Sequence, residues 1–363
     1  MFIKILLVCL IFGTLFTEDI SLQINTDKEQ YRLGDEIILK VILENKGSKN
    51  ITMKIPKVDH RSLFIGFKYA ADTGKKRTYY SFPTLDFINK IKKIEDLDVF
   101  YKNNKIEREE QFIVKMGSYP IAEMLKPANL KEQILKPGEK TEDEIRLTAV
   151  RSGDCEITAY YAGLLENPNL WEFDNYIVSN SLKINIKGKE LHAILETDIG
   201  SIEFRFRPDL ALNHVHQFCR QASDGFYEKT YFHRIINGFM AQGGDNNTLD
   251  YDDSNDGMGN PGYMLPLEIS REKHKEGTLS TARTALYNTA GSQFFICSPR
   301  HKREDGDRQD SLNNKYSIFG EMIMVDQNRK VLKNLCATQS DLQKDGKVLK
   351  KVYINSVKIK VIE

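Results

Sequence analysis

The first half of the chain alternates apolar and polar residues with the two-residue period that is typical of β-strands. The clearest example has an apolar side chain at every second position: Ile37, Leu39, Val41 and Leu43. Turn signals flank this run at 34–35 and 45–47, and further apolar runs follow at 145–150, 155–161 and 182–186. Short strands separated by turns predict an antiparallel β-sandwich, which we place at residues 18–188.

The second half opens with two more alternating runs and then changes period. Residues 191–206 predict a pair of strands, whereas Val215, Phe218 and Cys219 have the i, i+3, i+4 spacing of a helix that opens near residue 208. A second amphipathic helix is predicted at 326–335, and closing strands at 348–361. Residues 189–363 are therefore predicted to form a second domain that is mainly β with two helices.

Residues 1–17 form a separate unit. One lysine, Lys4, precedes a short apolar run, and this run is shorter than the ~20 residues that a membrane-spanning helix needs. The pattern predicts a signal peptide over 1–17 and an exported protein, periplasmic or extracellular. Residues 6–9 resemble a lipobox, so a lipid anchor on Cys9 is the less favoured alternative.

Composition narrows the classes of function. The chain has 363 residues, of which 52 are basic and 51 acidic, giving a formal net charge of +1; this balance argues against nucleic-acid binding. The acidic run at 250–256 lacks the spacing of an EF-hand calcium loop. The cysteines after residue 17 follow no zinc-ligand spacing: Cys155, Cys219, Cys297 and Cys336. We therefore expect no metal and no cofactor.

Two blocks in the second half carry the candidate chemistry. The first, residues 232–245, has the sequence Phe-His-Arg-Ile-Ile-Asn-Gly-Phe-Met-Ala-Gln-Gly-Gly-Asp. The second comprises 277–283, Gly-Thr-Leu-Ser-Thr-Ala-Arg, and 288–296, Asn-Thr-Ala-Gly-Ser-Gln-Phe-Phe-Ile. Taken singly, the aromatic and apolar residues fit a protein core, and Arg234 fits a salt-bridged surface position. Both blocks together, in this order, indicate a functional site.

The two blocks resemble the signature stretches of cyclophilin-type peptidyl-prolyl isomerases, and the similarity covers residues 190–363. The resemblance implies an eight-stranded β-barrel capped by two helices, with proline-containing polypeptides as substrates and no cofactor. It implies that Arg234 and Gln242 are the catalytic residues. The substrate-binding residues that it implies are Phe239, Met240, Ala282, Arg283, Gln293, Phe295, Leu312 and Tyr316. The N-terminal segment, in turn, resembles bacterial immunoglobulin-like modules.

The reaction explains why an arginine and an apolar slot belong together. Rotation about a prolyl peptide bond has a barrier of about 18–20 kcal/mol because the amide has partial double-bond character. In the twisted amide the nitrogen regains a lone pair that can accept a hydrogen bond. A guanidinium, always charged and rigid, is suited to donate that bond. His233 points to the opposite face of its strand and is expected to be structural.

The chain departs from the family pattern at three places. Ser311 stands where cyclosporin-sensitive members carry tryptophan, so weak cyclosporin binding is expected. Tyr316 stands where many members have histidine. Residues 299–311 form a charged insertion, interpreted as a solvated loop, with a flap over the groove as the alternative.

Two further alternatives remain open at the level of sequence. The barrel can be a non-catalytic binding module for one proline-containing partner, although the complete set of Arg234, Phe239, Gln242 and Phe295 favours the enzyme. The sandwich can hold client proteins or tether the enzyme at the cell envelope, and nothing in its sequence chooses between these roles.

Overall fold

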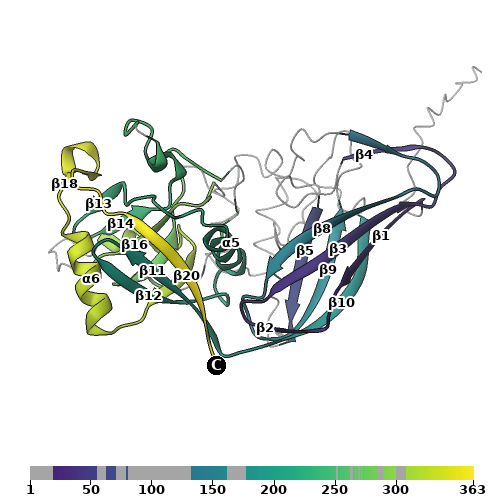
Figure 1. Cartoon of the computed structure of the whole chain (residues 1–363), viewed down its shortest axis with the longest axis horizontal. Coiled ribbons are helices and arrows are strands. Elements are labelled where there is room, and N and C mark those ends of the chain that lie inside the picture. Colours follow the sequence, from purple (N-terminus) through teal and green to yellow (C-terminus); the bar gives the residue numbers. More distant parts are fainter. Residues whose placement is uncertain are drawn as a thin grey trace, which may run out of the picture.

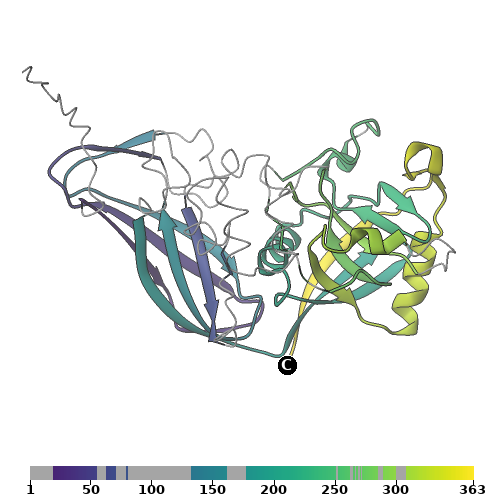
Figure 2. The same cartoon turned by 180° about the vertical axis from the view of Figure 1, so that it is seen from behind.

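The computed structural model describes residues 19–54, 63–70, 79–80, 132–161, 177–250, 252–261, 265, 267–268, 270, 272–284, 289–299 and 308–363. The signal segment, Cys9, Trp171 and residues 300–307 of the charged insertion lie outside these ranges. The described parts form two lobes, with helix α5 (Leu212–Ser223) between them in both views (Figures 1 and 2). Among the described residues, none of the helices is long and apolar enough to cross a membrane.

The N-terminal lobe is built from β-sheets. One sheet has the order β1 (Ile20–Thr26), β3 (Glu36–Asn45), β8 (Lys140–Thr148). A second has the order β2 (Gln30–Arg32), β10 (Ile177–Lys187), β9 (Gly153–Tyr161), β5 (Leu63–Tyr69), β6 (Tyr79–Tyr80). A short pair joins β4 (Ile51–Lys54) to β7 (Glu132–Leu135).

The alternating pattern of β3 explains this lobe. Ile37, Leu39, Val41 and Leu43 are at most 1% exposed, because every second side chain of a strand points to the same face. The side chain of Asn180 on β10 donates to the Ile24 carbonyl and accepts from the Ile24 N–H, and so ties the second sheet to β1. The pairing is antiparallel, as predicted, except that β2 runs parallel to β10, a pair that the prediction did not include.

The C-terminal lobe contains the eight strands of the predicted barrel. They lie in the order β13 (Arg234–Ile236), β14 (Met240–Gly243), β16 (Phe294–Cys297), β15 (Thr278–Thr281), β17 (Ile318–Met322), β12 (Gly200–Phe206), β11 (Glu190–Thr197), β20 (Ile354–Ile362). Two further short strands, β18 (Ser340–Asp341) and β19 (Lys347–Val348), extend the same sheet beside β13. All neighbouring pairs are antiparallel. The Phe232 N–H donates to the Val352 carbonyl at 3.1 Å, and Tyr231 forms a β-bridge with Tyr353, so the segments that lead into β13 and β20 meet and close the barrel.

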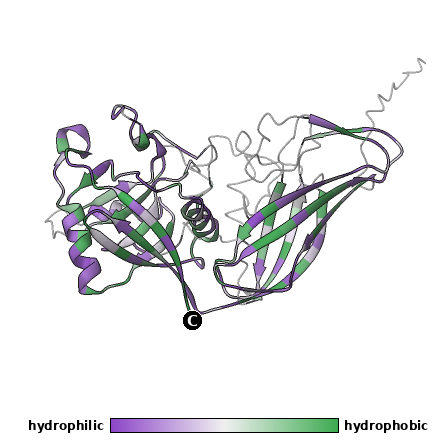
Figure 3. Cartoon of the chain, in the orientation of Figure 1, coloured by the Kyte–Doolittle hydropathy of each residue, from purple (hydrophilic) through white to green (hydrophobic). Residues whose placement is uncertain are grey.

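Two helices cover the barrel, as predicted. Helix α5 buries one apolar stripe that includes Val215, Phe218 and Cys219, and the Phe218 ring lies 5.6 Å from that of Phe294 on β16. Helix α6 (Asp326–Cys336) buries Val331 and Leu335 and packs on β12. Figure 3 shows the resulting alternation of apolar and polar positions along the strands of both lobes.

The two lobes are in direct contact. Strands β10 and β11 are separated by residues 188–189 alone. Gly34, with φ +82°, lies against the barrel, and a Cβ there would be 3.2 Å from Val361 Cγ2. On α5, His216 Nε2 accepts a 2.7 Å hydrogen bond from the Thr148 N–H of β8. The predicted domain boundary at 188/189 falls in the short connection, and that boundary stays a prediction.

Candidate active site

The β13–β14 hairpin places Arg234 beside Gln242. The two residues are Cα partners across the hairpin, and the turn between the strands is made by Gly238 with φ +74°. Nη1 of Arg234 lies 3.5 Å from Gln242 Oε1 and 3.7 Å from Met240 Sδ. The side chain of Arg234 is 28% exposed, so the guanidinium is partly accessible to solvent.

Gln293 continues this row of polar groups. Its Oε1 accepts a 2.9 Å hydrogen bond from Gln242 Nε2. Its own Nε2 donates to the carbonyls of Gly257 and Gly259, each at 2.9 Å. The contact of Gln242 with Arg234, implied by the sequence, is therefore present, and Gln293 fixes the orientation of the Gln242 amide.

An apolar cluster lies next to these polar groups. Phe239 and Tyr316 are half-buried and pack against a buried set. The Phe295 and Tyr316 rings meet edge to face, with centroids 5.5 Å apart. The buried members are Ile236, Met240, Ala282, Phe295, Cys297 and Leu312.

The fold thus brings six of the eight implied substrate-binding residues into one cluster: Phe239, Met240, Ala282, Phe295, Leu312 and Tyr316. The sulfur of Met240 also faces Arg234. Ile236 and Cys297 belong to it as well and were missed, because their apolar runs indicated only core.

A second contact of Arg234 was not expected from the sequence. The carboxylate of Asp345 accepts from Nη2 at 2.9 Å and from Nε at 3.0 Å, and the Asp345 carbonyl accepts from Nε at 2.9 Å. The Lys-Asp-Gly-Lys run at 344–347 is a turn signal, but no local pattern indicates what such a turn contacts.

Comparisons with known proteins agree with this geometry. The family model described as cyclophilin type peptidyl-prolyl cis-trans isomerase/CLD matches residues 192–359. A peptidyl-prolyl cis-trans isomerase of Synechococcus elongatus is 45% identical over 114 residues, which cover 31% of this chain and 73% of that protein. A probable isomerase of Brucella abortus is 35% identical over 163 residues, 43% of this chain and 79% of that one. The chain belongs to the cyclophilin-type peptidyl-prolyl isomerase family.

Among solved structures, a cyclophilin-type isomerase of Cryptosporidium parvum is 27% identical, with a TM-score of 0.40; the match covers 47% of this chain and 98% of that one. The activity of the protein described here, as a member of this family, is peptidyl-prolyl cis-trans isomerisation. The sequence left open whether the barrel is an isomerase or a non-catalytic binding module. Membership of this family of enzymes decides in favour of the isomerase.

Two arginines border the apolar cluster. The Arg283 guanidinium lies 4.6 Å above the Tyr316 ring and donates to the carbonyls of Lys315 and Thr284. The Arg308 guanidinium lies 4.9 Å from the Phe239 ring centre. Arg308 begins η6 (Arg308–Leu312), so the last residues of the charged insertion contact the apolar cluster. Ser311, in the same helix, is exposed.

Two buried histidines lie near the site and are neutral at neutral pH. His274 stacks on Phe295 with ring centroids 5.8 Å apart, and burial lowers its pKa to about 4. His233, which was expected to be structural, is 5% exposed. Burial lowers the pKa of His233 to about 4 as well. Among the described residues, no group of three or more His, Cys, Asp or Glu is placed to hold a metal ion.

Proposed function

We propose that Arg234 catalyses the isomerisation by donating a hydrogen bond to the prolyl nitrogen of the twisted amide. The observation that carries this proposal is that Nη1 of Arg234 lies beside Met240. A charged donor therefore lies next to an apolar cluster that is able to hold a proline ring. A donor that bonds the twisted amide more strongly than the planar one lowers the barrier, since only such differential contacts accelerate a reaction.

The apolar cluster is the proposed proline pocket. Phe239, Phe295 and Leu312 would hold the ring, while Gln293 and the backbone at 282–283 bind the extended polypeptide on either side. Arg283 and Arg308 contact Tyr316 and Phe239 at the edge of this cluster. Their positive charge would favour polar and acidic residues on either side of the proline.

The test is an isomerisation assay on a short X-Pro peptide with the wild type and Arg234→Ala. Removing one transition-state hydrogen-bond donor commonly costs about 100-fold in rate, and we expect kcat/KM to fall by that order while the circular dichroism spectrum is unchanged. Arg234→Lys keeps the charge but not the fork of donors and should be intermediate. A folded Arg234→Ala protein with wild-type kcat/KM would refute the role of Arg234.

We further propose that the enzyme assists the folding of exported proteins. The apolar run after Lys4 supports export, with residues 1–17 removed as a signal peptide or, less favoured, Cys9 lipidated. Mass spectrometry of the mature N-terminus, after fractionation of the producing cells, tests this directly. A cytoplasmic protein that keeps residues 1–17 would contradict it.

The N-terminal lobe is proposed to be an immunoglobulin-like domain that holds client proteins near the barrel. Its two sheets, with the Asn180 link between them, support a sandwich, and its contact with α5 places it beside the isomerase. The whole chain should then accelerate a proline-limited protein refolding reaction more, relative to its rate on a short peptide, than residues 189–363 do. If the ratio of refolding rate to peptide rate is the same for the whole chain and for residues 189–363, the alternative role as an envelope tether is favoured.

A further inference from the structure

The guanidinium of Arg234 is held on the side away from the pocket by one residue. Asp345 bonds Nη2 and Nε through its carboxylate and Nε again through its carbonyl. Two parallel N–H···O contacts between a planar guanidinium and a carboxylate fix both distance and orientation. On the other side, the contacts of Nη1 with described residues are the longer ones to Gln242 and Met240, at 3.5 and 3.7 Å.

The backbone, rather than side-chain packing, holds Asp345 in place. Its side chain is 79% exposed, but its φ of +52° and the +80° of Gly346 form a tight turn. The Ile235 N–H donates to the Gly346 carbonyl at 2.8 Å, and a Cβ on Gly346 would lie only 2.8 Å from the Ile235 carbonyl oxygen. The turn is therefore pressed onto β13 directly beside Arg234, and a glycine is needed there.

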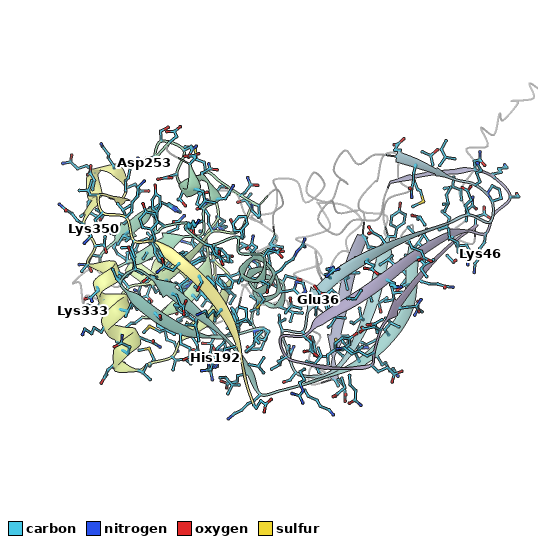
Figure 4. The ribbon with its side chains drawn as sticks, in the orientation of Figure 1. Glu36, Lys46, His192, Asp253, Lys333 and Lys350 are labelled. Atoms are coloured by element: carbon cyan, nitrogen blue, oxygen red, sulfur yellow. The ribbon has the colours of Figure 1, made fainter. Side chains whose placement is uncertain are left out.

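Short strands on both sides fasten the turn. β18 (Ser340–Asp341) pairs with β19 (Lys347–Val348), and β19 pairs with β13 through Lys347 and Arg234. Lys351 Nζ donates to Asp253 Oδ1 at 2.8 Å and ties the segment after β19 to the neighbouring loop. Asp253 and Lys350 mark the two segments in Figure 4, at the same end of the lobe.

We propose that Asp345 is a positioning residue: it binds the Nε/Nη2 edge of Arg234 and so turns the Nη1 edge toward the proline pocket. This inference rests on the role proposed for Arg234. A free arginine side chain has about 2 kcal/mol of rotamer entropy, and misorientation of a catalytic donor by a small distance costs much of its effect. A partner fixed by backbone holds the guanidinium before the substrate arrives.

The test compares Asp345→Asn with Asp341→Asn. Asparagine tolerates the left-handed backbone of position 345 and keeps the carbonyl contact, but its NH2 group cannot accept a hydrogen bond, so the second carboxylate contact is lost. Asp341 lies in the same turn, and its Oδ1 accepts only from the Gln343 N–H among the contacts of the described residues, a bond that asparagine can keep. Both substitutions therefore remove one negative charge, but only Asp345→Asn removes a carboxylate that contacts Arg234.

We expect kcat/KM of Asp345→Asn to fall about five- to tenfold, mainly in kcat, as for an exposed but bidentate pair. Asp341→Asn should match the wild type. The effect should vanish in an Arg234→Ala background, because a residue that acts through Arg234 has nothing left to position. A merely structural role would instead lower activity in both backgrounds.

The outcomes separate the two proposals. If Arg234→Ala is fully active, the role of Arg234 fails. If Arg234→Ala is impaired but Asp345→Asn equals Asp341→Asn, only the positioning role fails. A rise in kcat/KM for Asp345→Asn would also overturn it, since Asp345 would then compete with substrate for the guanidinium.

Discussion

His233 makes the stability of the barrel depend on pH in a calculable way. Burial lowers its pKa to about 4 from the ordinary histidine value of 6.5; the charge of Arg234 acts in the same direction and Asp245 opposes it. An unfolded chain therefore takes up a proton on this histidine as the pH falls through 6.5, whereas the folded chain does so only near 4. Stability must fall between pH 6.5 and 4 and is unaffected by His233 above that window.

The magnitude follows from the shift. One pKa unit corresponds to about 1.4 kcal/mol, so the full loss below pH 4 is about 3 kcal/mol, and about 2 kcal/mol of it is present at pH 5. Both ring nitrogens of His233 are buried without a hydrogen-bond partner among the described residues. His233→Phe therefore removes the titration without breaking such a bond, and similar ring volume limits the packing cost.

Urea unfolding at pH 7.5 and pH 5.0, followed by circular dichroism and by residual isomerase activity, measures the effect. The free energy of unfolding of the wild type should drop by about 2 kcal/mol more than that of His233→Phe between the two pH values. His274 and the carboxylates titrate in both proteins and cancel in this difference. Equal pH dependence in the two proteins would show that His233 is not held neutral by burial.

Three further predictions concern the pocket and the lobe contact. Phe295→Leu removes the ring contacts with Tyr316 and His274, so kcat/KM should fall about tenfold in the peptide assay while the free energy of unfolding changes by about 1 kcal/mol. Ser311→Trp adds an aromatic ring beside Leu312, and the Kd for cyclosporin, measured by calorimetry, should tighten at least about tenfold from a weak starting value. His216→Ala leaves the Thr148 N–H without its acceptor and should lower the free energy of unfolding by about 1–3 kcal/mol, with peptide turnover unchanged. An unchanged urea midpoint for His216→Ala would show that the lobe contact adds no stability.

Periodicity predicted the elements because burial acts on every second residue of a strand and on one face of a helix. Ile37 to Leu43 and the stripe on α5 are buried as their spacing indicated. The start of α5 differs: the helix was expected to open near 208, but residues 208–210 form a turn, Ala211 is the N-cap, and Leu212 is the first helical residue. Local spacing marks the existence of a helix better than its first turn.

Contacts between distant segments were beyond the reach of local patterns. Arg234 and Asp345 are 111 residues apart, and their contact depends on the order in which the barrel strands meet. The same holds for the parallel pairing of β2 with β10, which involves only three residues on β2. The residues of the apolar cluster, in contrast, were named through the resemblance, which carries such long-range information implicitly, and their role in binding substrate stays a prediction.

The contact between Asp345 and Arg234 joins an early barrel strand to a segment near the end of the chain. Arg234, Gln242 and the apolar cluster come from β13 to β16 and the η6 turn, whereas the contact that orients Arg234 arrives with β18 and β19, just before the last strand β20. The bridge from Tyr231 to Tyr353 closes the barrel next to the same segment. Within the part of the chain that the structure describes, the turn at 341–348 is anchored on β13 and on the loop that holds Asp253. If Asp345 has the positioning role proposed above, a chain that ends before β18 and β19 should therefore keep the apolar cluster but lose the orientation of Arg234.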